Sequence, residues 1–324
     1  MKQRVLDFIA AAKGWDEPAF EALALDLYRW QRAHNPEYDA FCGEAQVSRW
    51  AEIPAAPVAL FRDLTLTCFP PGEATAVFLT SGTTGSRRGA HRLRDTDATD
   101  LGARRHIERC LGSVPRRGVS LVSGEPDSSL GHMCFGFVPD MPRFFSLDGG
   151  VDRAGAWAAL RGAREPLFVP GTAFALADLV AEDPPACPLP VGSVVMVTGG
   201  YKGRRLSVPE DQLHARLAAL FPGARVVGEY GMTELSSQLW SVPVGGAFLP
   251  PPWMRVQAVD PWTGAPARQG LLRFFDLANH QTVLAIETQD LGEVQADGSV
   301  LLSGRLGGAE PRGCSLTVEE ASGG

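Results

Sequence analysis

Lysine is scarce in this chain, which also lacks a long apolar run and a basic tail. Lys2, Lys13 and Lys202 are the only lysines, so arginine supplies 27 of the 30 basic side chains. A net charge of −7 without a basic cluster argues against nucleic-acid binding, which needs concentrated positive charge. No apolar run approaches the roughly 20 residues of a membrane span, and Asp7 stands where a signal peptide would be apolar. We therefore expect a cytoplasmic protein without a membrane span.

Cysteine is also sparse, and no two cysteines form a C-x-x-C motif. Neither a disulfide framework nor a zinc site is expected, because both depend on grouped ligands. Most of the thiols should be small buried side chains. The six cysteines are Cys42, Cys68, Cys110, Cys134, Cys187 and Cys314.

The first fifty residues have the apolar spacing of helices. Phe20, Leu23, Leu27 and Trp30 recur at three- and four-residue steps, and Asp16 stands before them as an N-cap. Prolines between residues 54 and 71 then interrupt the pattern. We predict a helical start over residues 1–50.

The centre of the chain, residues 76–250, alternates short apolar runs that end in glycine with stretches of helical pattern. This alternation predicts an α/β fold with mostly parallel sheets flanked by helices. Residues 253–304 instead show β-type runs separated by turns, which predict a smaller antiparallel β region. The sequence thus predicts one core over residues 1–304 and a short tail over residues 305–324.

A glycine-rich loop stands at residues 78–89, where an apolar strand leads into small and hydroxyl residues and then into two arginines. Backbone N–H groups, hydroxyls and positive charge can converge there on one anion, and phosphate is the natural ligand. The alternative is a surface loop whose hydroxyls bond to its own backbone. The residues concerned are Thr80, Ser81, Gly82, Thr83, Thr84, Gly85 and Arg88.

Three more segments follow in a fixed order. Residues 226–235 read VVGEYGMTEL, residues 288–292 read TQDLG and residues 297–305 read DGSVLLSGR. With the glycine-rich loop, they resemble the signatures of the adenylate-forming superfamily, which includes acyl-CoA synthetases, luciferases and peptide-synthetase adenylation domains. Arg87 and Arg88 replace the usual Pro and Lys of that family's loop, and Gln289 replaces a glycine.

The resemblance implies ATP and Mg²⁺ as cofactors and assigns roles to single residues. Thr80 to Gly85 would wrap the β- and γ-phosphates, Tyr230 would stack on adenine, Thr233 would contact the α-phosphate, and Glu234 would bind Mg²⁺. Asp290 would hold the ribose, and Arg305 would also reach the nucleotide. The remaining residues assigned to ATP on this basis are Arg88, Gly199, Gly200, Glu229, Gly231 and Met232.

Shorter fragments are similar to one short branch of that superfamily, the acyl-protein synthetases of the bacterial luciferase system. They are SSLGHM at 128–133, TGGYK at 198–202 and PRGCSL at 311–316. By this resemblance Lys202 would stabilise charge on the α-phosphate, and Cys314 would accept the acyl group. The alternatives are an exposed lysine at a strand end and a buried thiol. His132 is a candidate for orienting the carboxylate, with a structural histidine as the alternative.

The predicted reaction is ATP-dependent activation of a carboxylic acid, fatty or aryl, to an acyl-adenylate. Transfer to a thiol would follow, on Cys314, an acyl-acceptor protein, a carrier protein or CoA. Typical relatives continue past the last motif into a small mobile domain, so we expect that domain to be absent here. A nucleotide- or acyl-adenylate-binding protein without turnover is the alternative function.

Overall fold

Helices at the N-terminus form the first layer of the computed structural model, which describes residues 1–80, 87–147, 149–199 and 210–306. The helices predicted for residues 1–50 are present, and Asp16 caps the second by accepting a hydrogen bond from the Ala19 N–H at 3.1 Å. Phe20 and Leu27 of its apolar stripe are fully buried, whereas Trp30 is half-buried. These helices are α1 (Lys2–Ala11), α2 (Glu17–His34) and α3 (Pro36–Cys42).

A mostly antiparallel sheet follows from the last third of the sequence, as predicted. Its strands lie in the order β1-β14-β13-β11-β12, and β15 pairs with β14. The short strand β1, from the N-terminal part, adds to β14 in parallel. The strands are β1 (Ala56–Pro57), β11 (Met254–Val259), β12 (Pro266–Ala267), β13 (Gln269–Asp276), β14 (Ala285–Val294) and β15 (Val300–Arg305).

The N-terminal helices pack against this sheet, so the first and last parts of the chain share one hydrophobic core. Phe20 and Leu27 of α2 belong to the same buried cluster as Phe274 and Ile286 of the sheet. Gln31 joins the two by polar contacts as well, because its amide donates to the Asn279 carbonyl and accepts from the Leu284 N–H, each at 2.9 Å. Such buried and paired polar groups fix how the helix sits on the sheet.

The centre of the chain forms a second sheet, and its order β10-β9-β8-β7-β4 is parallel except at the antiparallel edge strand β10. This confirms the α/β fold. The first strand of this sheet is short: Arg117–Gly118 pairs regularly, whereas Leu121 in the apolar run that follows makes an isolated bridge to Gly171. The strands are β4 (Arg117–Gly118), β7 (Leu167–Thr172), β8 (Val194–Thr198), β9 (Arg225–Tyr230) and β10 (Leu239–Ser241).

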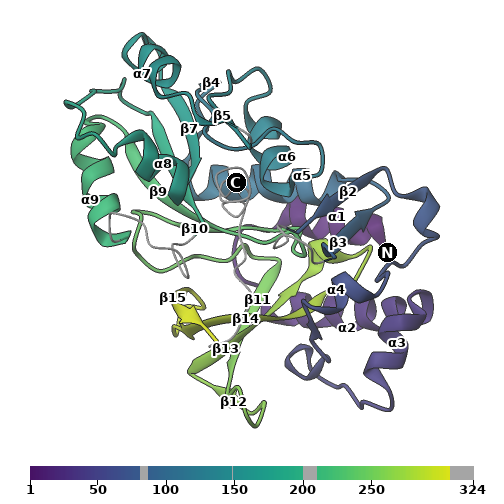
Figure 1. Cartoon of the computed structure of the whole chain (residues 1–324). Coiled ribbons are helices and arrows are strands. Elements are labelled where there is room, and N and C mark those ends of the chain that lie inside the picture. Colours follow the sequence, from purple (N-terminus) through teal and green to yellow (C-terminus); the bar gives the residue numbers. More distant parts are fainter. Residues whose placement is uncertain (81–86, 148, 200–209, 307–324) are drawn as a thin grey trace.

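Helices cover both faces of this parallel sheet (Figure 1). Side chains of β8 alternate between the two coverings: Val194 and Met196 pack with α5 and α6, while Val195 and Val197 pack with α7, α8 and α9. Strands buried on both faces explain the continuous apolar runs of the sequence. The helices are α5 (Asp97–Leu111), α6 (Ser129–Phe137), α7 (Arg153–Arg161), α8 (Ala173–Leu179) and α9 (Glu210–Leu220).

The apolar run before the glycine-rich loop lies outside the parallel sheet. Strands β2 (Ala76–Leu79) and β3 (Ala90–Leu93) pair with each other in an antiparallel hairpin, so the glycine-rich loop connects two neighbouring strands. The alternation of strands and helices predicted mostly parallel sheets and did not indicate this antiparallel pairing. Smaller elements are α4 (Leu60–Asp63), β5 (Phe145–Ser146) and β6 (Gly150–Val151), with short 3₁₀ turns at Trp50–Glu52, Pro71–Glu73 and Leu277–Asn279.

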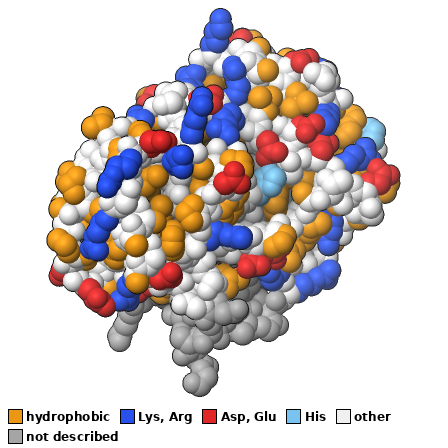
Figure 2. All heavy atoms as spheres, turned by 90° about the horizontal axis from the view of Figure 1, so that it is seen from above, with side chains coloured by type: hydrophobic (Ala, Val, Ile, Leu, Met, Phe, Trp, Pro, Cys, Tyr) orange, Lys and Arg blue, Asp and Glu red, His pale blue; other side chains and the backbone are white. Residues whose placement is uncertain are grey.

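The surface mixes charges of both signs. On the face drawn in Figure 2, basic and acidic side chains are interspersed with apolar ones. This pattern matches the small net charge of the whole chain. Within the described ranges, no helix is long and apolar enough to cross a membrane.

Candidate functional site

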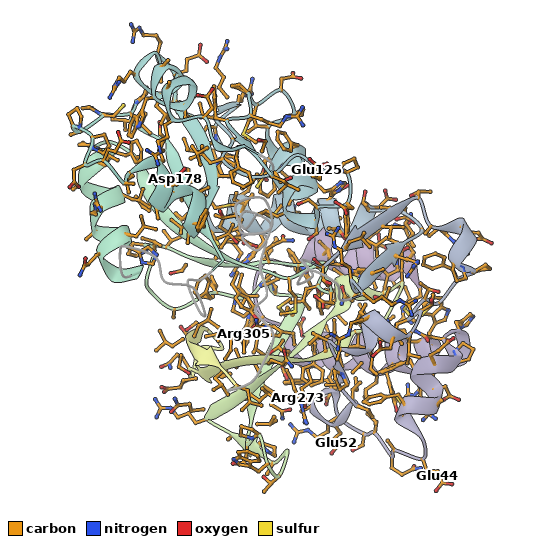
Figure 3. The ribbon with its side chains drawn as sticks, viewed as in Figure 1. Glu44, Glu52, Glu125, Asp178, Arg273 and Arg305 are labelled. Carbon is orange, nitrogen blue, oxygen red and sulfur yellow. The ribbon has the colours of Figure 1, made fainter. Side chains whose placement is uncertain are left out.

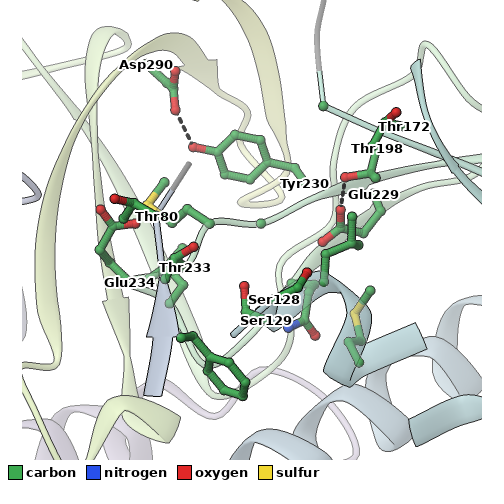
Figure 4. A pocket seen from close by; sticks show the side chains of 18 of the residues that line it. Thr80, Ser128, Ser129, Thr172, Thr198, Glu229, Tyr230, Thr233, Glu234 and Asp290 are labelled. Atoms are coloured by element: carbon green, nitrogen blue, oxygen red, sulfur yellow. Dashed lines mark hydrogen bonds between the residues drawn. The ribbon is translucent and has the colours of Figure 1, made fainter. Parts of the chain in front are cut away.

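A pocket of about 350 Å³ opens at the carboxyl ends of β8 and β9, where open α/β sheets commonly bind ligands. It gathers residues that lie far apart in sequence, from the β2–β3 hairpin, the parallel sheet and β15. Figure 4 shows part of this lining, with Thr80, Tyr230 and Asp290 labelled. Every described residue that the sequence assigned to ATP or Mg²⁺ lines the pocket. They are Thr80, Arg88, Gly199, Glu229, Tyr230, Gly231, Met232, Thr233, Glu234, Asp290 and Arg305.

Tyr230, Asp290 and Arg305 form a connected group on one wall of the pocket. The Tyr230 hydroxyl donates to Asp290 Oδ2 at 2.8 Å, and Arg305 Nε lies 2.8 Å from Asp290 Oδ1. Asp290 and Arg305 face each other as a cross-strand pair of β14 and β15, which is why they meet. Figure 3 shows that Arg305 lies at the end of its sheet nearest the parallel sheet. The Tyr230 ring stacks on Phe274, with centroids 5.5 Å apart, so its position is fixed by packing.

The ends of the glycine-rich loop are held by an arginine. Arg88 donates through Nε to the Thr80 carbonyl at 2.6 Å, and its Nη1 lies 2.9 Å from Asp127 Oδ2. The Thr80 hydroxyl accepts from the Gly89 N–H at 2.8 Å. Thr80 and Arg88 therefore close the base of the loop at the pocket, while the predicted residues Ser81, Gly82, Thr83, Thr84 and Gly85 lie outside the described residues.

His91 also contributes to the pocket, although its sequence context gave no reason to select it. Its Nδ1 lies 2.7 Å from the Thr233 carbonyl, and its Nε2 lies 3.1 Å from the Thr282 hydroxyl. Burial lowers the pKa of His91 to about 4, so the ring is neutral and Nδ1–H donates to the carbonyl. Beside it, Glu234 is 1% exposed, and its own carbonyl accepts from Asn279 Nδ2 at 2.9 Å. These bonds hold the turn that carries Thr233 and Glu234.

Glu229 faces a different part of the pocket from Tyr230, because successive residues of a strand point to opposite faces. The Thr198 hydroxyl donates to Glu229 Oε2, and Figure 4 shows this pair apart from Tyr230 and Asp290. Burial raises the pKa of Glu229 to about 7, and the hydrogen bond from Thr198 only partly offsets this. The geometry thus favours a task for Glu229 other than contact with the nucleotide.

Replacing Glu229 by glutamine should make the unfolding free energy less sensitive to pH. The wild-type carboxyl has a folded-state pKa of about 7 against an ordinary 4.5, so it keeps a proton that the unfolded chain has released. Wild-type stability should therefore fall as the pH rises through that range, by up to about 3 kcal/mol, and the variant should escape this loss. Denaturant unfolding of wild type and variant at about pH 4 and about pH 8 measures how the unfolding free energy of each protein changes with pH. Asp276 and the buried histidines contribute equally to this change in the two proteins, so their effect cancels in the comparison. If the difference in unfolding free energy between wild type and Glu229→Gln were the same at both pH values, the raised pKa of Glu229 would be contradicted.

Of the remaining candidates the structure describes His132, which does not line this pocket. His132 lies on an adjoining hollow, where its Nε2 is 2.7 Å from Asp100 Oδ1 and its ring touches Phe78. This position favours the structural alternative for His132. Gly200, Lys202 and Cys314 lie outside the described residues.

Solved structures of several enzymes share this fold. A 2-hydroxyisobutyryl-CoA ligase in complex with 2-HIB-AMP and CoA aligns with a TM-score of 0.65 and 17% identity, over 89% of this chain and 68% of that one. The luciferase-like enzyme of the nonluminescent mealworm Zophobas morio aligns with a TM-score of 0.54 and 16% identity, over 75% of this chain and 60% of that one. ATP-bound MatB from Rhodopseudomonas palustris aligns with a TM-score of 0.53 and 15% identity, over 73% of this chain and 49% of that one. The adenylation-domain fold expected from the sequence motifs is thereby confirmed.

The chain matches about half to two thirds of the length of these structures. No protein-family profile matches the sequence, and no curated protein matches it. At identities of 14% to 17% the structural likeness carries the fold alone.

Proposed function

We propose that this protein activates a carboxylic acid with ATP, producing an acyl-adenylate and pyrophosphate, and then transfers the acyl group to a thiol. One observation carries the proposal: the pocket joins the ends of the glycine-rich loop, the YGMTE turn, Asp290 and Arg305. These segments come from separate parts of the chain and follow the order of the superfamily's signatures. The fold shared with MatB, whose structure holds ATP, supports the same reading.

The proposed first step is attack by a carboxylate oxygen on the α-phosphorus of ATP. A new P–O bond forms, the bond to the β-phosphate oxygen breaks, and pyrophosphate leaves with the electron pair. Thr80 and Thr233 can donate hydroxyl hydrogens to phosphate oxygens, and Asp290 can accept from ribose hydroxyls. Because the carboxylate of Asp290 has about four acceptor sites, it can bind ribose while Tyr230 and Arg305 stay in place.

Magnesium fits the pocket through Glu234. Among the described residues no three His, Cys, Asp or Glu side chains are grouped to hold a metal. Mg²⁺ characteristically takes one or two carboxylates together with substrate phosphates, so a single buried Glu234 suits it. When bound, the ion would neutralise phosphate charge. Glu234 would hold it beside the nucleotide.

For the second step we propose the chemistry of the acyl-protein synthetases. A thiolate attacks the acyl carbon, a thioester forms, and AMP leaves. Support comes from the sequence fragments around His132, Lys202 and Cys314, and CoA, a carrier protein or a partner cysteine are the other acceptors. Intact-mass measurement after incubation with acid and Mg·ATP tests Cys314: we expect a hydroxylamine-labile acyl adduct, which a Cys314→Ser variant should lack.

ATP–pyrophosphate exchange across a panel of fatty and aromatic acids tests the proposed function. The proposal expects exchange that depends on one class of acid and on Mg²⁺, because formation of the adenylate is reversible. Tight binding of ATP with no exchange for any acid would instead favour a nucleotide-binding protein without turnover. Absence of both ATP binding and exchange would refute the assignment of the pocket.

A further inference from the structure

Three polar side chains stand in one row at the carboxyl ends of the parallel strands. Thr172 of β7 pairs in register with Thr198 of β8, which pairs in turn with Glu229 of β9. The row is 3%, 8% and 5% exposed in the same order, and all three residues line the pocket. We call Thr172, Thr198 and Glu229 the strand-end row.

The strand-end row lies on the face of the sheet that α5 and α6 cover. Alternation along β7 and β8 places Thr172 and Thr198 on the same face as Phe168 and Met196, which pack with those helices. Ser128 and Ser129, at the start of α6, line the same part of the pocket (Figure 4). The row and these serines thus form a polar compartment within the pocket.

In this compartment both an acceptor and hydroxyl donors lack hydrogen-bond partners among the described residues. Glu229 Oε2 accepts from Thr198, but Oε1 has no partner among the described residues. The hydroxyl oxygens of Thr172 and Ser128 accept from the N–H groups of Ala175 and Gly131, at 3.1 and 3.0 Å, as helix N-caps. For the hydroxyl hydrogens of these two caps, the described part of the chain offers no acceptor. When Glu229 is ionised, the compartment therefore presents one acceptor, Glu229 Oε1, and two donors, the Thr172 and Ser128 hydroxyls, to whatever fills it.

The position of Glu229 Oε1 depends on the adjacent glycine. A Cβ atom at Gly231 would lie 2.6 Å from Oε1, so only glycine leaves room for the carboxylate in this orientation. A carboxylate that is nine-tenths buried is costly unless it is paired. Among the described residues Oε1 has no partner, so a ligand in the pocket can supply one.

We propose that the strand-end row selects a carboxylic acid that carries a hydroxyl group. The substrate hydroxyl donates its hydrogen to Glu229 Oε1 and accepts one from a surrounding hydroxyl. The acid's own carboxylate then extends toward Thr233 and the nucleotide. This inference rests on the proposed function, because it identifies the substrate class of the same pocket.

A hydroxyl suits the compartment better than the other substituents of an acid. An unsubstituted alkyl or aryl group would bury Glu229 Oε1 without a hydrogen bond, which is costly. An ammonium group only donates, so it would offer no acceptor to the free hydrogens of Thr172 and Ser128. A hydroxyl both donates and accepts, which matches the acceptor and the donors of the compartment.

Calorimetric titration of the full chain with matched acids tests the inference without requiring turnover. The probes are butyrate and benzoate, the isomers of hydroxybutyrate and hydroxybenzoate, and the corresponding amino acids. At least one hydroxy isomer should bind about 10- to 100-fold more tightly than its parent and amino analogues. Equal binding of the parent, tighter binding of an amino analogue, or no binding of any acid would overturn the inference.

Two variants and a control assign the preference to the row. Glu229→Leu should abolish the preference for the hydroxy acid. The isosteric Glu229→Gln should weaken this preference, and it serves as the test if Glu229→Leu fails to fold. Asp276→Asn removes another buried carboxyl, which does not line the pocket, and should keep the preference. A preference that persists in both Glu229 variants would overturn the role of the row.

Pyrophosphate exchange with the same acids separates this inference from the proposed function. Hydroxy-selective binding without any exchange would support the row and refute acid activation. Exchange that shows no preference for a hydroxyl would support acid activation and overturn the row.

Discussion

Glu234→Gln should reduce acid-dependent ATP–pyrophosphate exchange by about 100- to 1,000-fold, the range seen when one group that stabilises transition-state charge is removed. Glu234 is 1% exposed, lines the pocket beside Thr233 and carries the proposed bond to Mg²⁺. Glutamine keeps the size of the side chain but removes the negative charge, so the ion should be held more weakly. Initial exchange rates at several Mg²⁺ concentrations measure both effects, and the concentration for half-maximal rate should rise.

Glu287→Gln provides the matched control. Glu287 pairs with Arg273, with Arg273 Nε 2.8 Å from Glu287 Oε2, and does not line the pocket. Its replacement removes a carboxylate from the same chain without touching the proposed metal site, so exchange and its Mg²⁺ dependence should stay near wild type. A Glu234→Gln protein that exchanges within about threefold of wild type would show that Glu234 does not bind an essential ion.

The second large effect is expected from Asp290→Ala, which should raise the Kd for ATP by about 100-fold, or roughly 3 kcal/mol. Asp290 is proposed to bind the ribose, and it already accepts from Tyr230 and pairs with Arg305. Its loss would leave the Arg305 guanidinium, 14% exposed, without this partner in the pocket. We also expect a loss of about 2 kcal/mol in unfolding free energy from breaking a largely buried pair.

Asp290→Asn separates charge from hydrogen bonding, because the amide oxygen can still accept from Tyr230 while the charge facing Arg305 is gone. Its ATP affinity should fall between those of wild type and Asp290→Ala. Asp297→Ala is the control, since among the described residues Asp297 bonds to Ser299 of its own turn and does not line the pocket. Calorimetric titration with ATP compares all four proteins, and unchanged affinity in Asp290→Ala would remove Asp290 from the nucleotide site.

Much of the fold and of the pocket could be predicted because local patterns carried it. The apolar runs of β7, β8 and β9 end where a parallel sheet ends, so the polar residues that follow were expected at one edge. The motif residues Tyr230, Glu234, Asp290 and Arg305 do line one pocket. Thr172 and Thr198 could have been found in the same way, because each is the residue that ends an apolar run.

Long-range pairing was beyond the reach of the sequence patterns. Nothing local indicates that Ala56 pairs with Ile286, or that β2 leaves the parallel sheet to pair with β3. The β-type runs of residues 253–304 were expected to be separated by turns, but the runs on either side of Asp290 form one strand, β14, which continues through the polar residues 288–290. His91 was missed because its partners, Thr233 and Thr282, follow it by well over a hundred residues.

Strand β9 carries neighbouring residues that serve opposite sides of the pocket, Glu229 toward α6 and Tyr230 toward Asp290. A substitution at position 229 can therefore alter one side alone, whereas inserting or deleting a single residue in β9 would exchange the two faces. Attempts to redirect the acid preference should keep the length of β9 fixed. In the divergence of related chains, this strand should accept changes of side chain far more readily than changes of length.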